Sequence, residues 1–214
     1  MSLRIPIETS ARHVHISKED FEKLFGEGAS LTDVKELSQP AQYVCKERVT
    51  VSTPHGSFEN MAILGPFRKE TQIEISVTDS RKLKLPVPIR QSGDLEGTPG
   101  CTLTGPNGSI ELDRGVIVAK RHIHMTPYEA LRERVKDNDN VFVIMESFER
   151  SLIFADVVVR VHPDYRLAMH IDTDEANAVA NTEDPSGVIL KLFGGTAVDL
   201  REWSEEIQSG INRF

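Results

Sequence analysis

Two short segments of the sequence place a pair of histidines one residue apart, directly after an arginine. One pair is His13 and His15, and the other is His122 and His124. In a β-strand, alternate side chains point to the same face, so each pair presents two imidazoles to one side. The arginines fall on the opposite face and are poor candidates for ligands. Two imidazoles on one face form half of a zinc site.

Each histidine pair is followed by an alternating segment with one further possible ligand, Glu74 in the first half and His170 in the second. Each of these residues stands between two aliphatic residues. A catalytic zinc takes three protein ligands and keeps an open position. Taken singly, the histidines are also compatible with core or solvated positions, and Glu74 with an outer face. The matched repeat favours two metal sets, which are His13, His15 and Glu74, and His122, His124 and His170.

The chemistry of an open zinc site includes polarising a carbonyl, activating water and holding a phosphate oxygen. Arg68 lies in a Gly-Pro turn six residues before Glu74, and its planar guanidinium suits phosphate or carboxylate. A solvated basic turn is the alternative for this residue. The sequence has no phosphate-loop, dinucleotide-binding or Ser-His-Asp pattern, which disfavours P-loop transferases and dehydrogenases.

The elements that position these residues recur in the same order in both halves. Each histidine pair reads as a strand, followed by a helix that begins at Ser17 or Thr126, and then by a hairpin and the strand of the third ligand. The predicted fold is mainly β with short helices (α+β), in two tandem duplicated β-barrel domains. Predicted boundaries are 1–90 for the first barrel, 91–114 for a Gly- and Pro-rich crossover and 115–214 for the second barrel. A last strand at 188–193 and a helix from Asp199 to the terminus are also expected.

Composition limits the class of protein. The 214 residues carry a formal net charge of −8, which argues against nucleic-acid binding and leaves any anionic ligand to a local group of Arg and Lys. No apolar run is long enough to cross a membrane, and no signal peptide is evident. Cys45 and Cys101 are too few for a disulfide framework and are expected to be buried free thiols in a reducing compartment.

Several motifs together resemble the propanediol-utilisation type of phosphotransacylase, the phosphate propanoyltransferase family, over nearly the whole chain. They are Ser10-Ala-Arg-His-Val-His15, Leu37-Ser-Gln-Pro40, Leu64-Gly-Pro-Phe-Arg-Lys-Glu-Thr-Gln-Ile-Glu-Ile75, Ser92-Gly-Asp-Leu-Glu-Gly-Thr-Pro-Gly100, Arg121-His-Ile-His-Met125 and Met169-His-Ile-Asp-Thr-Asp-Glu-Ala-Asn-Ala178.

The resemblance implies transfer of an acyl group, propanoyl or acetyl, from coenzyme A to inorganic phosphate, which yields acyl phosphate and free coenzyme A. It implies a site with two zinc ions held by the two sets above, the division of the six ligands between the ions being left open, and Arg68 as the catalytic residue that binds phosphate. For coenzyme A it points to four residues: Ser10, His55, Leu64 and Asn177. It also implies a homodimer.

The chain departs from the family pattern at three positions. Ala62 and Val77 stand where members usually carry Arg, and His55 stands where Lys is common. Coenzyme A affinity or acyl choice is therefore expected to differ from other members. Members that enter bacterial microcompartments often carry an extra N-terminal amphipathic helix. Here the first strand starts almost at Met1, so we expect a bacterial cytoplasmic protein, or one brought to a microcompartment by a partner.

The expected mechanism is direct attack of phosphate on the thioester, because no nucleophile is evident for an acyl-enzyme. Three other functions stay open. A two-zinc hydrolase acting on thioesters or phosphoesters would release product without phosphate. A structural or regulatory zinc protein would have closed sites and no turnover. An inactive zinc-binding relative is compatible with Ala62 and Val77.

Overall fold

The computed structural model describes residues 2–147, 149–179 and 184–190, which are mainly β with four short helices. They divide into two compact units: unit 1 combines the residues up to Thr9 with those from Arg121 onward, and unit 2 is Ser10–Lys120. The predicted helix from Asp199 lies outside the described residues, as does the end of the predicted strand 188–193. Among the described residues, no helix has the length and apolar character needed to cross a membrane.

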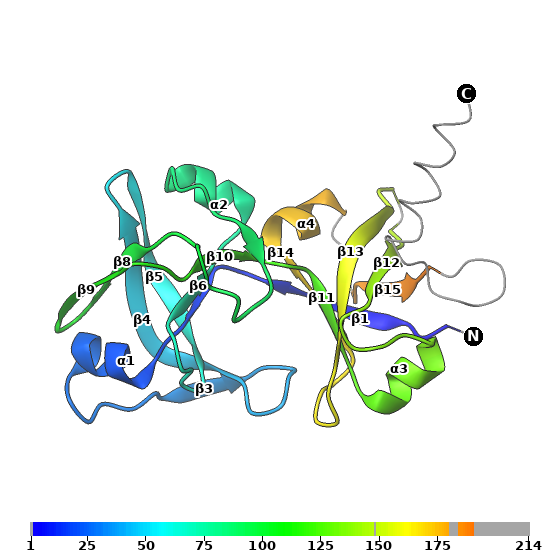
Figure 1. Cartoon of the computed structure of the whole chain (residues 1–214), viewed down its shortest axis with the longest axis horizontal. Coiled ribbons are helices and arrows are strands. Elements are labelled where there is room, and N and C mark those ends of the chain that lie inside the picture. Colours follow the sequence, from blue (N-terminus) through cyan, green and yellow to red (C-terminus); the bar gives the residue numbers. More distant parts are fainter. Residues whose placement is uncertain (1, 148, 180–183, 191–214) are drawn as a thin grey trace. The chain divides into compact units, whose positions relative to one another are not determined.

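Unit 1 is a closed barrel with strand order β1-β14-β11-β13-β12-β15 (Figure 1). Its strands are β1 (Ile5–Ser10), β11 (His122–Met125), β12 (Asn140–Met145), β13 (Leu152–Val161), β14 (Ala168–Asp172) and β15 (Ser186–Ile189). Its helices are α3 (Pro127–Glu133), which begins at the predicted cap Thr126, and α4 (Thr173–Ala178). Closure joins every strand to two neighbours, so this barrel agrees with the predicted one.

Unit 2 is a nine-stranded sheet whose main path is β7-β10-β6-β2-β5-β4-β8-β9, with β3 paired to β4. Its strands are β2 (His13–His15), β3 (Asp33–Glu36), β4 (Tyr43–Thr53), β5 (Gly56–Gly65), β6 (Gln72–Glu74), β7 (Ile89–Arg90), β8 (Cys101–Gly105), β9 (Gly108–Leu112) and β10 (Val116–Ala119). Its helices are α1 (Lys18–Phe25) and α2 (Val77–Lys82). The path ends at β7 and β9 without joining them, so this unit has an open sheet where the sequence predicted a β-barrel domain.

Each histidine pair lies on its own short strand, which has one parallel and one antiparallel neighbouring strand. Strand β2 pairs in parallel with β5 and antiparallel with β6, and β11 pairs in parallel with β13 and antiparallel with β14. His13 stands directly opposite Glu74, and His122 directly opposite His170. Residues that face each other across a ladder share one side of the sheet. The register therefore brings each predicted third ligand to its histidine pair.

The core of each unit lies on the opposite side of these strands from the histidines. In unit 2, Val14 between the two histidines and Ile73 beside Glu74 are fully buried in one apolar cluster. In unit 1, Ile123 and Met169 occupy the corresponding places in the other cluster. Burial of these aliphatic side chains fixes the register, because a slip by one residue would turn them to the other face.

The strand before each histidine pair belongs to the unit that does not contain that pair. Strand β1 leads into β2 but pairs with β15 and β14 of unit 1. Strand β10 leads into β11 but pairs with β6 and β7 of unit 2. The division by contacts thus differs from the predicted boundaries. The predicted crossover 91–114 also contains β8 and β9, a hairpin that extends the sheet of unit 2.

Candidate metal and substrate site

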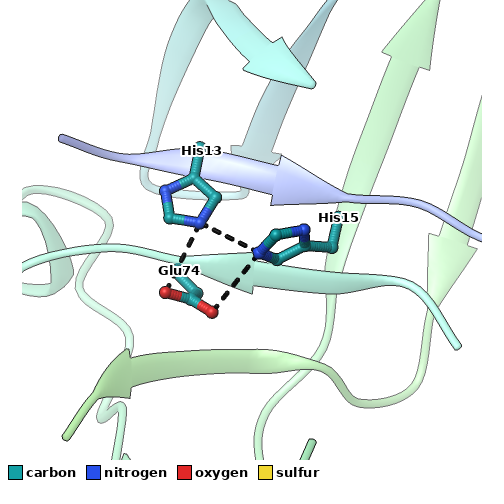
Figure 2. A group of neighbouring side chains, drawn as sticks. All are labelled: His13, His15 and Glu74. Atoms are coloured by element: carbon teal, nitrogen blue, oxygen red, sulfur yellow. Dashed lines mark hydrogen bonds and ion pairs between the residues drawn. The ribbon is translucent and has the colours of Figure 1, made fainter. Parts of the chain in front are cut away.

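The first set of predicted ligands converges in unit 2. Nε2 of His13 lies 3.2 Å from Nε2 of His15, and the Glu74 carboxylate oxygens lie 3.4 Å and 3.6 Å from these two nitrogens (Figure 2). All three residues are buried, and their possible ligand atoms lie within 4.8 Å of one another. Two imidazole nitrogens and one carboxylate directed at one point are a donor set that suits zinc.

Backbone groups orient both imidazoles of this set. Nδ1 of His13 donates to the carbonyl oxygen of Ala11 at 2.8 Å, and the backbone of Leu64 makes a hydrogen bond to His15. This arrangement leaves Nε2 of each ring for a ligand, as in metal sites where the second ring nitrogen is held by the protein. Burial, with the charge of His13 as a further cause, lowers the pKa of His15 to about 3. His15 is therefore neutral at physiological pH, the form that binds metals.

Two polar residues that were not predicted as part of the site complete the surroundings of Glu74. Nε2 of Gln72 donates to Oε1 of Glu74 at 2.5 Å, and Oγ of Ser92 donates to the same oxygen at 3.1 Å. Oε1 of Gln72 in turn accepts from the N–H of Gly93 at 2.7 Å. Gln72 is only 1% exposed. These contacts fix the carboxylate in one orientation.

Gln72 could have been found from the sequence, since it lies two residues before Glu74 and shares its face. Ser92 could not, because a loop of the predicted crossover brings it to the site.

Arg68 joins this group through Ser92. Its Nη1 donates to Oγ of Ser92 at 2.8 Å, and its backbone N–H donates to the carbonyl oxygen of Ile16 at 2.9 Å, next to the end of β2. One serine hydroxyl thus connects the predicted phosphate ligand to the predicted metal ligand Glu74. A guanidinium beside a buried donor set is suited to hold an anion such as phosphate or a carboxylate.

The second set of predicted ligands lies together in unit 1. The ring centroids of His122 and His124 are 4.7 Å apart. The ring centroid of His170 lies 5.2 Å from that of His122 and 4.9 Å from that of His124. A carboxylate oxygen of Glu8 lies 3.8 Å from Nε2 of His170. Burial, with the charge of His122 as the next cause, lowers the pKa of His124 to about 2. Three neighbouring imidazoles, of which His124 is neutral at physiological pH, are residues of the type that binds zinc. Among the described residues, however, only the first set has its possible ligand atoms gathered within 4.8 Å of one another.

One side of His124 is covered by Tyr165, which the sequence did not point to. The two ring centroids are 4.4 Å apart in an edge-on arrangement. Nδ1 of His124 is buried, and no described residue hydrogen bonds to it. Unlike His13, His124 is therefore oriented on this side by ring packing. The contact between Tyr165 and His124 was hard to predict from the sequence, because Tyr165 lies in the turn between β13 and β14.

The arginine before each histidine pair binds the short helix after the third ligand. Arg12 pairs with Asp79 at 2.9 Å, and Arg121 pairs with Glu175 at 2.6 Å. Each acid is also the third helical residue of a capping box, in α2 and α4. The sequence analysis predicted no helix in either segment, so α2 and α4 were missed. The arginines have a structural role near the ligands without pointing at them.

The four residues predicted for coenzyme A do not form one group within a unit. In unit 2, Ser10 is half-buried at the end of β1, and Leu64 is half-buried next to His15. His55 is exposed in the turn at the opposite end of the β4–β5 hairpin, where its N–H donates to Oγ1 of Thr53 at 3.2 Å. Asn177 is exposed on α4 of unit 1. The backbone of Leu64 contacts the predicted metal ligand His15.

Comparison with known proteins gives one consistent result. A family model described as phosphate propanoyltransferase matches residues 6–182. The chain is 58% identical over 181 residues to a phosphate propanoyltransferase of Thermotoga maritima, covering 84% of this chain and 86% of the relative. It is 53% identical over 185 residues to that of Enterococcus faecalis (86% and 87%), and 50% identical over 181 residues to that of Salmonella typhimurium (85% and 85%).

Proposed function

Because the chain belongs to the phosphate propanoyltransferase family and is therefore an acyltransferase, we propose that it transfers propanoyl or acetyl groups from coenzyme A to orthophosphate. The products are acyl phosphate and free coenzyme A. The observation that carries this proposal is the convergence of His13, His15 and Glu74 beside Arg68, linked by the Ser92 hydroxyl. The site combines a zinc-type donor set with a guanidinium that can bind phosphate.

In this proposal, one zinc ion is held by His13, His15 and Glu74 and a second by His122, His124 and His170. The neutral imidazoles, the oriented rings and the buried carboxylate support this assignment. When bound, zinc supplies Lewis-acid polarisation and charge stabilisation. The repeated strand arrangement around the two sets supports the further proposal that the two units arose by duplication, with a homodimer as the assembled form.

The protein's own residues have separate tasks in the transfer. Arg68 binds orthophosphate and orients one of its oxygens toward the thioester carbon, while Ser92 holds the guanidinium in place. The new C–O bond forms as the C–S bond breaks, and the sulfur leaves as the thiolate of coenzyme A. The negative charge that develops on the reacting oxygens is stabilised by the guanidinium.

Direct attack is supported by the state of the two cysteines. Cys45 and Cys101 are buried free thiols. Burial raises the pKa of Cys45 to about 11 and that of Cys101 to about 12, so neither is an activated nucleophile. Steady-state kinetics with varied acyl-coenzyme A and phosphate should therefore show the pattern of a ternary complex. Ping-pong kinetics, or acyl label retained on either cysteine, would contradict direct attack.

The decisive experiment measures acyl phosphate formation from propanoyl- and acetyl-coenzyme A, with and without phosphate, in Arg68→Ala, Arg68→Lys and the wild-type protein. Arg68→Ala should lower kcat/KM about 100-fold or more and raise KM for phosphate, because a positioned charge is removed, while zinc content stays unchanged. Lys69→Ala is the matched control, since Lys69 is the exposed neighbouring cation in the same turn.

Two results would count against the proposed function. Undiminished transfer by Arg68→Ala would remove Arg68 from the site. Thioester cleavage at the same rate without phosphate would favour a hydrolase, in which the proposed metal sites activate water.

A further inference from the structure

A row of four side chains crosses four adjacent strands of unit 2. Glu74 on β6 stands opposite His13 on β2, His13 is the ladder partner of Ala62 on β5, and Ala62 is the ladder partner of Arg48 on β4. Ladder partners share one face of a sheet. The next residues on these strands are buried in the core cluster on the other face: Ile75, Val14, Ile63 and Val49. Arg48 therefore lies on the same face as the candidate metal ligands.

The backbone next to Arg48 is irregular. Between the pairs Val44–Leu64 and Arg48–Ala62, the ladder advances four residues along β4 and only two along β5. Such a bulge redirects the side chains of the longer strand and is frequent beside active sites. Opposite the bulge, Ala62 has the smallest side chain that carries a Cβ, so little of β5 stands between Arg48 and His13.

The guanidinium of Arg48 is held by backbone and retains unused donors. Its Nη1 donates to the carbonyl oxygens of Cys45 and Glu47. Within the described part of the chain, neither Nε nor Nη2 of Arg48 has a hydrogen-bond partner, and no carboxylate pairs with this cation. The neighbouring carboxylate of Glu47 instead accepts from the N–H of Thr32 at 3.0 Å. Arg48 is therefore a half-buried, oriented cation whose charge is not neutralised there.

We propose that Arg48 binds a phosphoryl group of coenzyme A, a role that rests on the proposed acyl transfer. Two strand spacings separate Arg48 from His13, about 10 Å between backbones. Orthophosphate must contact the thioester carbon and has Arg68 next to Glu74 for that purpose. The phosphoryl groups of coenzyme A lie at the other end of the pantetheine chain and need a cation away from the reacting atoms. A planar guanidinium with free donors binds phosphoryl oxygens well.

The test compares Arg48→Ala with Lys46→Ala, which removes the same charge from an exposed position of the same strand. Arg48→Ala should raise KM for acyl-coenzyme A and Kd for coenzyme A about 10- to 100-fold, the loss expected for a charged hydrogen bond. The KM for orthophosphate, kcat and zinc content should stay within about twofold, as for a contact remote from the reacting atoms. Lys46→Ala should behave as wild type.

Calorimetric titration can separate binding of the phosphoryl groups of coenzyme A from binding of its pantetheine part. It does not require turnover. Arg48→Ala should weaken binding of coenzyme A but leave binding of pantetheine, which has no phosphoryl group, unchanged. A folded Arg48→Ala/Ala62→Arg double variant should recover coenzyme A binding, because residue 62 shares the face of residue 48. The proposal is overturned by an unchanged Kd for coenzyme A, by equal losses for pantetheine, by an effect confined to KM for orthophosphate, or by no recovery in the double variant. If wild type makes no acyl phosphate but Arg48→Ala weakens coenzyme A binding, only the proposed function fails.

Discussion

Replacing Gln72 should destabilise the protein more than any single hydrogen bond would suggest. The side chain is 1% exposed and makes three contacts: to Glu74 at 2.5 Å, to Ser92 at 2.9 Å and from the N–H of Gly93 at 2.7 Å. A neutral hydrogen bond contributes about 1 kcal/mol and one to a carboxylate about 1.5–3 kcal/mol. Gln72→Ala should therefore lower the free energy of unfolding by about 3–5 kcal/mol.

The measurement is urea unfolding of the metal-free protein, followed by circular dichroism at fixed pH. Gln72→Met keeps most of the side-chain volume but none of the polar contacts, so it should be destabilised to a similar extent as Gln72→Ala. The control is Gln91→Ala, a half-buried glutamine with no side-chain hydrogen bond within the described residues, which should change stability by less than about 0.5 kcal/mol.

Two outcomes would refute this reasoning. A loss below about 1 kcal/mol for Gln72→Ala would mean that the three contacts do not stabilise the folded state beyond what water provides. Wild-type stability in Gln72→Met would show that filling the space matters and that the hydrogen bonds do not. In the zinc-loaded protein, Gln72→Ala should also weaken metal binding by His13, His15 and Glu74 about 10- to 100-fold, because their carboxylate loses its orientation.

Two further predictions concern other buried groups. Tyr165→Ala should weaken zinc binding by the His124 set about 10- to 100-fold in chelator competition, whereas Tyr165→Phe should not, because ring packing orients His124. The pKa of Cys45 is raised by burial from its ordinary 9.0 to about 11, and that of Cys101 to about 12. Compared with the unfolded thiols, iodoacetamide at pH 8 should therefore modify native Cys45 about 100-fold more slowly and native Cys101 about 1000-fold more slowly. Because the folded pKa values are raised, the stability associated with these thiols is full below about pH 9 and is lost as pH rises toward 11–12.

Each of these predictions has a contradicting result. Equal zinc affinity in Tyr165→Ala and wild type would show that His124 is oriented without the tyrosine ring, and Tyr128→Ala, an exposed tyrosine of the same unit, is the control. Equal labelling rates in native and unfolded protein would show that the thiols are accessible.

The local sequence pattern was sufficient to predict the strands that carry the candidate ligands and the helices that follow the histidine pairs. Strand alternation placed His13 with His15 and His122 with His124, and the structure confirms both strands and the helices that start after Ser17 and Thr126. The two hairpins and the buried free state of both cysteines were also predicted correctly. These features depend on a period of two and on capping residues within a few positions, so they can be recognised without knowing the fold.

The sequence alone determined which residue types can bind zinc and phosphate, and that the residues of the zinc type lie on strands with alternating side chains. Only the tertiary structure decided that Ser92 joins Arg68 to Glu74, that Arg48 shares a row with His13, that unit 2 stays open and that β1 and β10 pair with the other half of the chain. The physical reason is that strand pairing and loop contacts link residues far apart in sequence. Their register is set by burial of side chains from several strands at once, which no local pattern contains.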